Sequence, residues 1–427
     1  MRTMRTKLDQ AKEAKRFDYT HATRRLFLGA VEIYCGAVEH ILSDLRAAEI
    51  GSRGFRAFRD YLSVYTQSDS FQGLAKEARE VISSLAGVRY CLLLQNGSVT
   101  VRDYQAEDDY TVAVEDIFEN FRRDATRRYR LEIRKWDGMN HIENQIQNRV
   151  ALLCPDVFGA LESFCAARAE YLNETVARFD REIQFYIAYL TYAEKFRRSG
   201  LLFCLPEVSA SKQIRGRDAF DVALAGRLLS ERKEVVLNDF YLIGSERIFV
   251  VSGPNQGGKT TFARMIGQLH YLASLGCPIP GSEAHLFRSD RIFTHFEREE
   301  HITNLRGKLQ DDLMRIHEIL SEATPNSLII MNEMFSSTAL KDAVYLSKVV
   351  MQRISDLDLL GVWVTFLDEL SSLNEKTVSV VSTVNPENPA IRTYKLERKP
   401  ADGLAYALAI AQKYHVTYDC LRERIKE

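Results

Sequence analysis

One stretch of sequence indicates the fold class: Val250-Val251-Ser252-Gly253-Pro254-Asn255-Gln256-Gly257-Gly258-Lys259-Thr260-Thr261. It fits the pattern G-x-x-x-x-G-K-T and continues an apolar run that is typical of a buried strand. In such a loop, backbone N–H groups surround phosphate oxygens, the lysine reaches the β and γ phosphates, and the next hydroxyl ligates Mg²⁺. A glycine-rich turn without a nucleotide is the plainer alternative. The stretch predicts a nucleoside triphosphate site with Mg²⁺, made by Gly253, Pro254, Asn255, Gln256, Gly257, Gly258, Lys259, Thr260 and Thr261.

Length and composition indicate an ordinary globular protein. The 427 residues are enough for two or three domains, and 46% are hydrophobic while 27% are charged. The formal net charge of −1 excludes a uniformly basic nucleic-acid binder, so any DNA contact would come from a local patch. Seven scattered cysteines without a C-x-x-C pair favour reduced thiols over a zinc site or disulfides. No apolar run approaches membrane-spanning length, so we expect a cytoplasmic protein without membrane contact.

The spacing of apolar residues changes near residue 200. Residues 8 to 200 show apolar side chains at three- and four-residue spacing, which predicts long helices. Two β-rich runs flank Asn96-Gly97 within this region, so we expect a small hairpin near residues 88–103. Beyond residue 206, short apolar strands alternate with helical segments, as in a mostly parallel sheet. The predicted fold is α + α/β, with a helical domain at residues 1–200 and an α/β domain at residues 201–427.

A second nucleotide motif has two candidates. An ATPase of this kind needs a strand that ends in an acidic residue near Mg²⁺, often followed by a glutamate that positions water. The strand-like run that ends in Asp368-Glu369 has both residue types. The run Ser327 to Met331 ends in Asn332-Glu333, with an asparagine in place of the aspartate. Spacing alone does not choose between them.

Residues 235–425 resemble the ATPase domain of the MutS family of DNA mismatch-repair proteins. The matching segments lie in the family's order and spacing: Leu237-Asn238-Asp239, Gly253 to Thr261, Ile279-Pro280-Gly281-Ser282-Glu283-Ala284 and Asp290-Arg291-Ile292-Phe293-Thr294. The tail at residues 401–411 is also similar to the family's closing segment. In this register the family's Asp-Glu pair falls on Asn332-Glu333, so the resemblance favours that candidate.

The resemblance also implies an organisation and roles for residues. The α/β domain would be an ABC-type P-loop ATPase domain, and the helical part would hold the family's core and lever helices with a shortened clamp hairpin. There is no room for the mismatch-recognition and connector domains. The expected cofactors are ATP and Mg²⁺, and the expected assembly is a homodimer. Lys259 and Glu333 would be catalytic, Thr260 and Asn332 would hold Mg²⁺, the latter through water, and Asn238 would contact the nucleotide.

The sequence departs from the family pattern at four positions. Phe366 replaces the switch histidine, and Asn332 removes a negative charge beside the metal; both changes point to weak hydrolysis. Gly307 stands near the sequence position at which the family has a serine that reaches the γ-phosphate bound by the partner subunit. Val235 stands where an aromatic ring usually meets the adenine, which suggests looser base selection.

A basic stripe follows the predicted hairpin. Residues 121–136 contain seven basic and two acidic side chains, which is typical of either a solvated helix face or a DNA-backbone contact. The candidate DNA contacts are Arg122, Arg123, Arg127, Arg128, Arg130 and Arg134. His295, His301 and His317 lie between the nucleotide motifs with no spacing that suits a metal site.

The predicted function is that of an ATP-dependent DNA-binding protein of MutS type. It would recognise mismatched or otherwise structured DNA, hydrolyse ATP weakly, and rearrange its dimer with nucleotide state. An ATP-binding switch or assembly protein that hydrolyses little and acts on a protein partner is the alternative. A small-molecule kinase is disfavoured by the long helical region.

Overall fold

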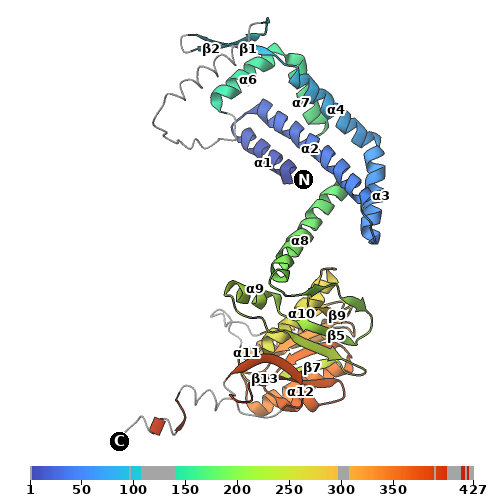
Figure 1. Cartoon of the computed structure of the whole chain (residues 1–427), viewed down its shortest axis with the longest axis vertical. Helices are drawn as coiled ribbons and strands as arrows, with labels where there is room; N and C mark the ends of the chain where they lie inside the picture. Colours follow the sequence, from blue (N-terminus) through green and yellow to red (C-terminus); the bar gives the residue numbers. More distant parts are fainter. Residues whose placement is uncertain are drawn as a thin grey trace. The chain divides into compact units, whose positions relative to one another are not determined.

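The computed structural model describes residues 2–95, 98–106, 140–296, 307–388, 391–401, 415–418 and 421–422. The chain divides into two compact units, Met1–Gln184 and Phe185–Glu427 (Figure 1). The division falls inside helix α8 (Glu174–Arg197). The boundary expected from the sequence, between residues 200 and 201, lies just after the end of that helix.

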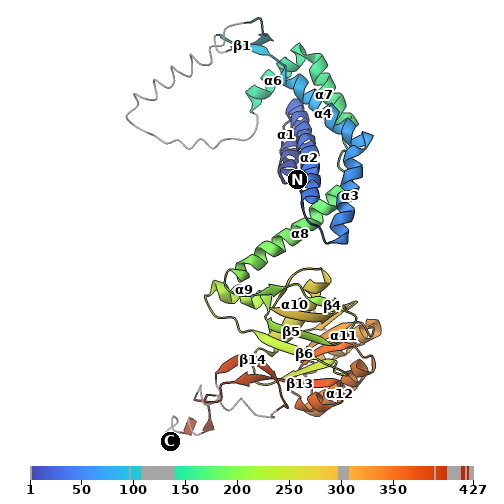
Figure 2. The ribbon, with the colours of Figure 1, turned by 45° about the vertical axis from the view of Figure 1, so that its right-hand side comes forward.

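The first unit is helical apart from one hairpin. Its central helix α2 buries Leu28, Val31, Tyr34 and Val38, whose spacing of three and four residues places them on one face. This face packs on the neighbouring helices, and α1 lies beside α2 (Figure 2). The helices are α1 (Arg2–Arg16), α2 (Thr20–Ala47), α3 (Arg53–Gln67), α4 (Asp69–Ala86), α6 (His141–Leu153), α7 (Pro155–Ala167) and the start of α8.

Two parts of this unit pass a length and composition test for membrane spans. They are α2 and the pair α6–α7, which is bent by 106°. The sequence has no uninterrupted apolar run of this length, because Glu32 and Glu39 lie in the middle of α2. The buried side chains of α2 pack within the helical core of the unit.

A two-stranded antiparallel hairpin interrupts the helices, as the sequence predicts. Strand β1 (Tyr90–Gln95) pairs with β2 (Ser98–Asp103), and Tyr90 lies opposite Asp103. The Asn96-Gly97 turn, the basic stripe and the tail at 402–411 lie outside the described residues.

The second unit is built on a six-stranded sheet with the order β10-β11-β12-β7-β13-β14. All neighbouring pairs are parallel except β13 with β14. This mixed content confirms the α + α/β class. The strands are β7 (Ile248–Ser252), β10 (Ile292–His295), β11 (Leu328–Asn332), β12 (Leu360–Val364), β13 (Thr377–Val384) and β14 (Arg392–Arg398).

Helices cover both faces of this sheet, so its central strands are buried on both sides. Alternate residues of β7 enter two different cores: Phe249 packs with Phe262 and Ile266 of α10, whereas Val250 shares a core with Ile316 and Met351. The helices concerned are α10 (Lys259–Ser274), α11 (Lys308–Glu322) and α12 (Leu340–Asp356).

A second sheet extends the unit, and its strands β5 and β6 lie side by side in Figure 2. Its four strands have the order β4-β9-β5-β6, and β3 pairs separately with β8. The remaining elements are β3 (Phe203–Cys204), β4 (Glu207–Ser209), β5 (Ile214–Ala219), α9 (Val222–Ser230), β6 (Asn238–Leu242), β8 (Ile279–Pro280), β9 (Glu283–Phe287) and the short 3₁₀ helix η1 (Asp368–Ser372).

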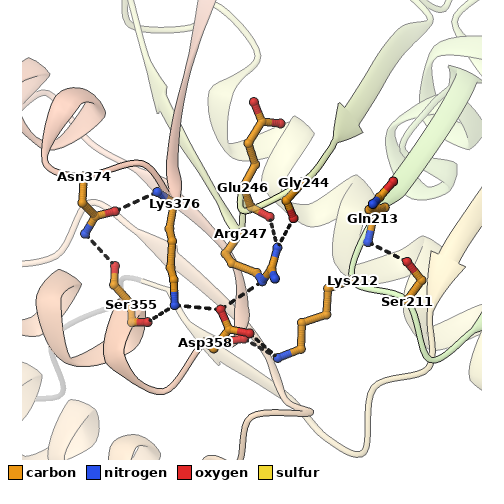
Figure 3. A network of polar contacts seen from close by, with 10 residues as sticks. All are labelled: Ser211, Lys212, Gln213, Gly244, Glu246, Arg247, Ser355, Asp358, Asn374 and Lys376. Atoms are coloured by element: carbon orange, nitrogen blue, oxygen red, sulfur yellow. Dashed lines mark hydrogen bonds and ion pairs between the residues drawn. The ribbon is translucent and has the colours of Figure 1, made fainter.

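One carboxylate ties together the amino ends of three neighbouring strands of the large sheet. Asp358, just before β12, lies 3.1 Å from Arg247 Nε before β7 and 2.7 Å from Lys376 Nζ before β13 (Figure 3). Lys212 Nζ adds a third contact at 2.9 Å. Burial alone would raise the pKa of Asp358, but hydrogen bonds from Lys376 and Lys212 and the charge of Arg247 lower it to about 2.

We expect Asp358→Asn to lower the free energy of unfolding by about 1–2 kcal/mol, since charge-assisted hydrogen bonds are lost at a partly exposed site. The pKa of Asp358 is depressed in the folded state. The contribution of the Asp358 carboxylate to the free energy of unfolding is therefore present above pH 4 and is lost as the pH falls toward about 2. Chemical denaturation from pH 7 to pH 2 checks both points. Asp356→Asn, at an exposed position on the same helix end, is the control and should cost nothing; equal stability of the two variants would contradict the prediction.

Candidate nucleotide site

The loop between β7 and α10 has a backbone that only glycine accommodates at several positions. Gly253 and Gly258 have φ angles of +112° and +96°, which L side chains rarely adopt. A Cβ on Gly257 would lie 2.2 Å from Ser382 Oγ and 2.9 Å from the Pro254 carbonyl oxygen. The loop therefore packs tightly on β13, and α10 begins directly after it, so its first N–H groups face the loop.

Lys259 is buried at the start of α10, with 4% of its surface exposed. Its ammonium donates hydrogen bonds to the carbonyls of Gly253 (2.9 Å) and Pro254 (3.1 Å) and lies 4.3 Å from the centre of the Phe366 ring. Burial lowers the pKa of Lys259, while the charge of Glu333 raises it and that of Arg392 lowers it. A buried cation whose hydrogen bonds go to neutral carbonyls favours the approach of an anion.

The structure brings Thr260 and Asn332 together. The Thr260 hydroxyl donates to Asn332 Oδ1 at 2.8 Å, although the residues are 72 positions apart. Asn332 ends β11 and is buried. Hydroxyl and amide oxygens are hard ligands of the kind that Mg²⁺ or its bound water accepts. In the part of the chain that the structure describes, no group of three or more His, Cys, Asp or Glu side chains could hold a metal.

Glu333 follows Asn332 and lines the same cavity as the loop. It has φ of +52°, an uncommon conformation for a residue other than glycine, and its N–H donates to the Val364 carbonyl at 2.9 Å. This bond fixes the turn after β11 to the end of β12. Uncommon backbone conformations of this kind concentrate at functional sites.

The rival pair Asp368-Glu369 has different surroundings. It begins η1, and Glu369 pairs with Lys348 of α12 at 2.7 Å. Neither residue lines the cavity that contains Glu333 and the loop. Phe366, just before them, is half exposed, with its ring against the Lys259 ammonium. The geometry supports the choice of Asn332-Glu333.

A cavity of about 500 Å³ extends from the loop toward α9. Its lining includes the apolar side chains of Leu224, Leu228, Val235 and Met265, and also the charged side chains of Lys233 and Glu234. Asn238 also lines it, but both polar atoms of this side chain bind β14: Nδ2 donates to the Tyr394 carbonyl (3.1 Å) and Oδ1 accepts from the Leu396 N–H (2.8 Å). In this structure Asn238 fixes β14 beside the cavity.

Three residues at the loop belong to no sequence motif that would have identified them as part of the site. Ser382 packs beneath Gly257, Tyr394 lines the cavity, and Arg392 Nε donates to the Asn255 carbonyl at 3.2 Å. They come from β13 and β14, more than 120 positions after the loop, and no spacing rule connects them to it. Only the strand order, which places β13 beside β7, brings them there.

Several other residues that the sequence singles out are either outside the cavity lining or outside the residues that the structure describes. His295 is buried with its Nε2 3.0 Å from Asp312 Oδ1, and His317 is exposed on α11. Gly307 is the N-cap of α11. His301 and the six candidate DNA contacts Arg122, Arg123, Arg127, Arg128, Arg130 and Arg134 are not among the described residues.

Comparisons with known proteins find one protein family over most of the second unit. Residues 249–422 match the family model MutS domain V. The chain is 27% identical over 172 residues to DNA mismatch repair protein MutS of Caldicellulosiruptor bescii, covering 39% of this chain and 19% of that protein. It is 28% identical over 191 residues to Endonuclease MutS2 of Thermus thermophilus, covering 44% and 26%. It is 30% identical over 148 residues to DNA mismatch repair protein MutS 2 of Halobacterium salinarum, covering 34% and 17%.

MutS domain V is the ATPase domain of that family. The match to this domain of the MutS family confirms the resemblance seen in the sequence. The chain spans between 17% and 26% of the length of these three relatives.

Restoring a carboxylate at position 332 tests the metal-site assignment. We expect Asn332→Asp to tighten Mg²⁺ binding by about tenfold, because a full negative charge returns beside the cation, and to raise steady-state ATP turnover. Asp368→Asn is the matched comparison and should leave both unchanged. If Asn332→Asp has no effect and Asp368→Asn abolishes turnover, the metal site lies at the rival pair.

Proposed function

We propose that this protein binds Mg²⁺·ATP at the loop of residues 253–261 and hydrolyses it weakly. The observation that carries the proposal is the hydrogen bond from Thr260 to Asn332, because it brings the loop and the second motif into one site beside buried Lys259. The tight glycine packing at the loop and the cavity that extends from it suit a phosphate chain with its nucleoside.

Each residue of the site has a proposed role. Lys259 and the backbone N–H groups of Gly253 and of Gly257 to Thr261 hold the phosphates, and Pro254, Asn255 and Gln256 shape the loop. Thr260 and Asn332 hold Mg²⁺, which would supply charge neutralisation on the phosphate oxygens when bound. Glu333 orients the attacking water. The apolar end of the cavity receives the base.

We further propose that the nucleotide state controls DNA binding by a homodimer. The relatives carry the names DNA mismatch repair protein and endonuclease, and the basic stripe at 121–136 supplies a local positive patch on a neutral chain. Mismatched or otherwise structured DNA is the proposed ligand. The dimer would place residues near Gly307 of one protomer at the γ-phosphate of its partner.

A second candidate is an ATP-binding switch that acts on a protein partner. It is favoured by Asn332, which lacks a charge for Mg²⁺, and by Phe366, whose apolar ring covers Lys259. Both features lower the expected rate of hydrolysis. DNA-stimulated turnover distinguishes the first candidate from the second.

We expect Lys259→Ala to weaken ATP binding by about 100-fold or more, since charge-assisted hydrogen bonds to the phosphates are lost. The fold should survive, because removing a buried ammonium also removes its desolvation cost. Titration calorimetry and thermal denaturation measure the two effects, and light scattering should show ATP-dependent dimers for the wild type alone. Lys195→Ala, which removes an exposed charge on α8 and does not touch the cavity lining, is the control. Unchanged ATP affinity in a folded Lys259→Ala protein would overturn the phosphate-loop assignment.

Neutralising four arginines of the stripe together tests its role in DNA binding. If Arg127, Arg128, Arg130 and Arg134 contact phosphates, their replacement by glutamine should weaken binding and flatten its salt dependence. Each lost contact removes about 0.9 from the slope of log affinity against log salt. Anisotropy measurements at several salt concentrations give the slope. The same slope in variant and wild type would assign the stripe to a solvated surface.

A further inference from the structure

One buried hydroxyl lies against the loop without a hydrogen-bond partner. Ser382 of β13 is fully buried, and among the residues that the structure describes no group donates to its Oγ or accepts from it. A buried polar group that makes no hydrogen bond costs free energy, so such a hydroxyl in a folded protein calls for an explanation. Ser382 contacts the loop of residues 253–261, which is where the proposed nucleotide binds.

The Ser382 hydroxyl lies close to two glycines and one carbonyl of the loop. A Cβ on Gly253 would lie 2.9 Å from Ser382 Oγ, and a Cβ on Gly257 would lie 2.2 Å from it. The same Cβ position on Gly257 is 2.9 Å from the Pro254 carbonyl oxygen. The hydroxyl and this carbonyl are thus both within 3 Å of one point, so a small movement of the loop would bring them to hydrogen-bond distance.

In the structure, the Pro254 carbonyl is bound by Lys259. The Lys259 ammonium donates to the Gly253 carbonyl at 2.9 Å and to the Pro254 carbonyl at 3.1 Å, so the bond to Pro254 is the longer one. An ammonium has three N–H donors, and the lysine of such a loop reaches both the β and the γ phosphate. A bound triphosphate therefore takes a donor from at least one of the two carbonyls. Without Lys259, the buried Pro254 carbonyl would keep only the Gly257 N–H, at 3.2 Å.

We propose that Ser382 positions the loop for nucleotide binding: its hydroxyl donates to the Pro254 carbonyl when the phosphates draw the Lys259 ammonium away. The proposal rests on the proposed ATP site and adds a positioning residue to it. Lys259 and Ser382 would then bind the same carbonyl in turn, so that it keeps a second donor in both states of the loop. The hydrogen bond that Ser382 gains contributes to the affinity for ATP, although Ser382 itself does not touch the nucleotide.

The first test is calorimetric titration of Ser382→Ala with ATP and with AMP. Binding of ATP should weaken by about fivefold, since one buried hydrogen bond is no longer gained. Binding of AMP should not change, because AMP has no β or γ phosphate to draw Lys259 away. The melting temperature without nucleotide should not fall, since the hydroxyl makes no hydrogen bond there. Ser379→Ala is the matched control: it removes another unpaired hydroxyl from β13, opposite Val250 in the middle of the sheet, and should bind ATP as the wild type does.

The second test needs no nucleotide. In Lys259→Ala protein the Pro254 carbonyl has lost the ammonium, so the Ser382 hydroxyl should already bind it. Adding Ser382→Ala to this variant should lower the melting temperature by about 2–4 °C, as expected for one hydrogen bond in a unit of this size, whereas the same change in the wild type lowers nothing. Thermal denaturation of the wild type, the two single variants and the double variant measures this coupling.

Three outcomes would overturn the role of Ser382. They are unchanged ATP affinity in Ser382→Ala, an equal loss of affinity for ATP and AMP, and an equal effect of Ser382→Ala on the melting temperature with and without Lys259. In each case the wild type still binds ATP and Lys259→Ala still fails to bind it, so the proposed function would stand. A wild type that binds no nucleotide would overturn both proposals.

Discussion

The hydrogen bond from the Thr260 hydroxyl to Asn332 joins the first turn of α10 to the end of β11, across the intervening strand β12. The site depends on this contact, because it fixes the position of the loop relative to Asn332 and therefore to the next residue, Glu333. Parallel strands make the contact possible, since their carboxyl ends meet at one edge of the sheet. At the opposite edge, Asp358 and its three cations hold the amino ends of β7, β12 and β13 together. Strand β7, which leads into the loop, is thus held near its amino end as well.

Local sequence predicted much of this arrangement. The G-x-x-x-x-G-K-T pattern located the loop because its glycines satisfy backbone needs that few other residues meet, and Asn-Gly located the hairpin for a similar reason. The local sequence did not choose between Asn332-Glu333 and Asp368-Glu369, since both pairs follow buried strands; the family resemblance favoured Asn332-Glu333, and the Thr260 hydrogen bond and the cavity lining agree with it. Arg392 and Ser382 could not be predicted, because a bulge and a strand crossover bring them to the loop. The resemblance indicated that Phe366 stands in place of the family's switch histidine. Only the structure shows that the Phe366 ring lies against the Lys259 ammonium.

These features suggest a site built more for holding nucleotide than for turning it over. Asn332 removes a charge from the proposed metal shell, and the apolar ring of Phe366 lies against the Lys259 ammonium. Tight phosphate binding with slow hydrolysis suits a protein whose nucleotide state controls another interaction. The match to a MutS domain makes DNA the first ligand to propose, and the basic residues of the stripe would contact it.

The central claim is that ATP at this loop changes the affinity for DNA. Fluorescence anisotropy with duplex, mismatched, junction and single-stranded DNA, each with and without Mg²⁺·ATP, tests it most directly. The account predicts that the wild type binds at least one of these DNAs with an affinity that ATP changes by about tenfold, which corresponds to a coupling free energy of about 1.4 kcal/mol. Lys259→Ala should bind the same DNA with no response to ATP. Failure to bind any of the four DNAs, or identical affinities with and without ATP, would contradict the account and favour a nucleotide switch that acts on a protein partner.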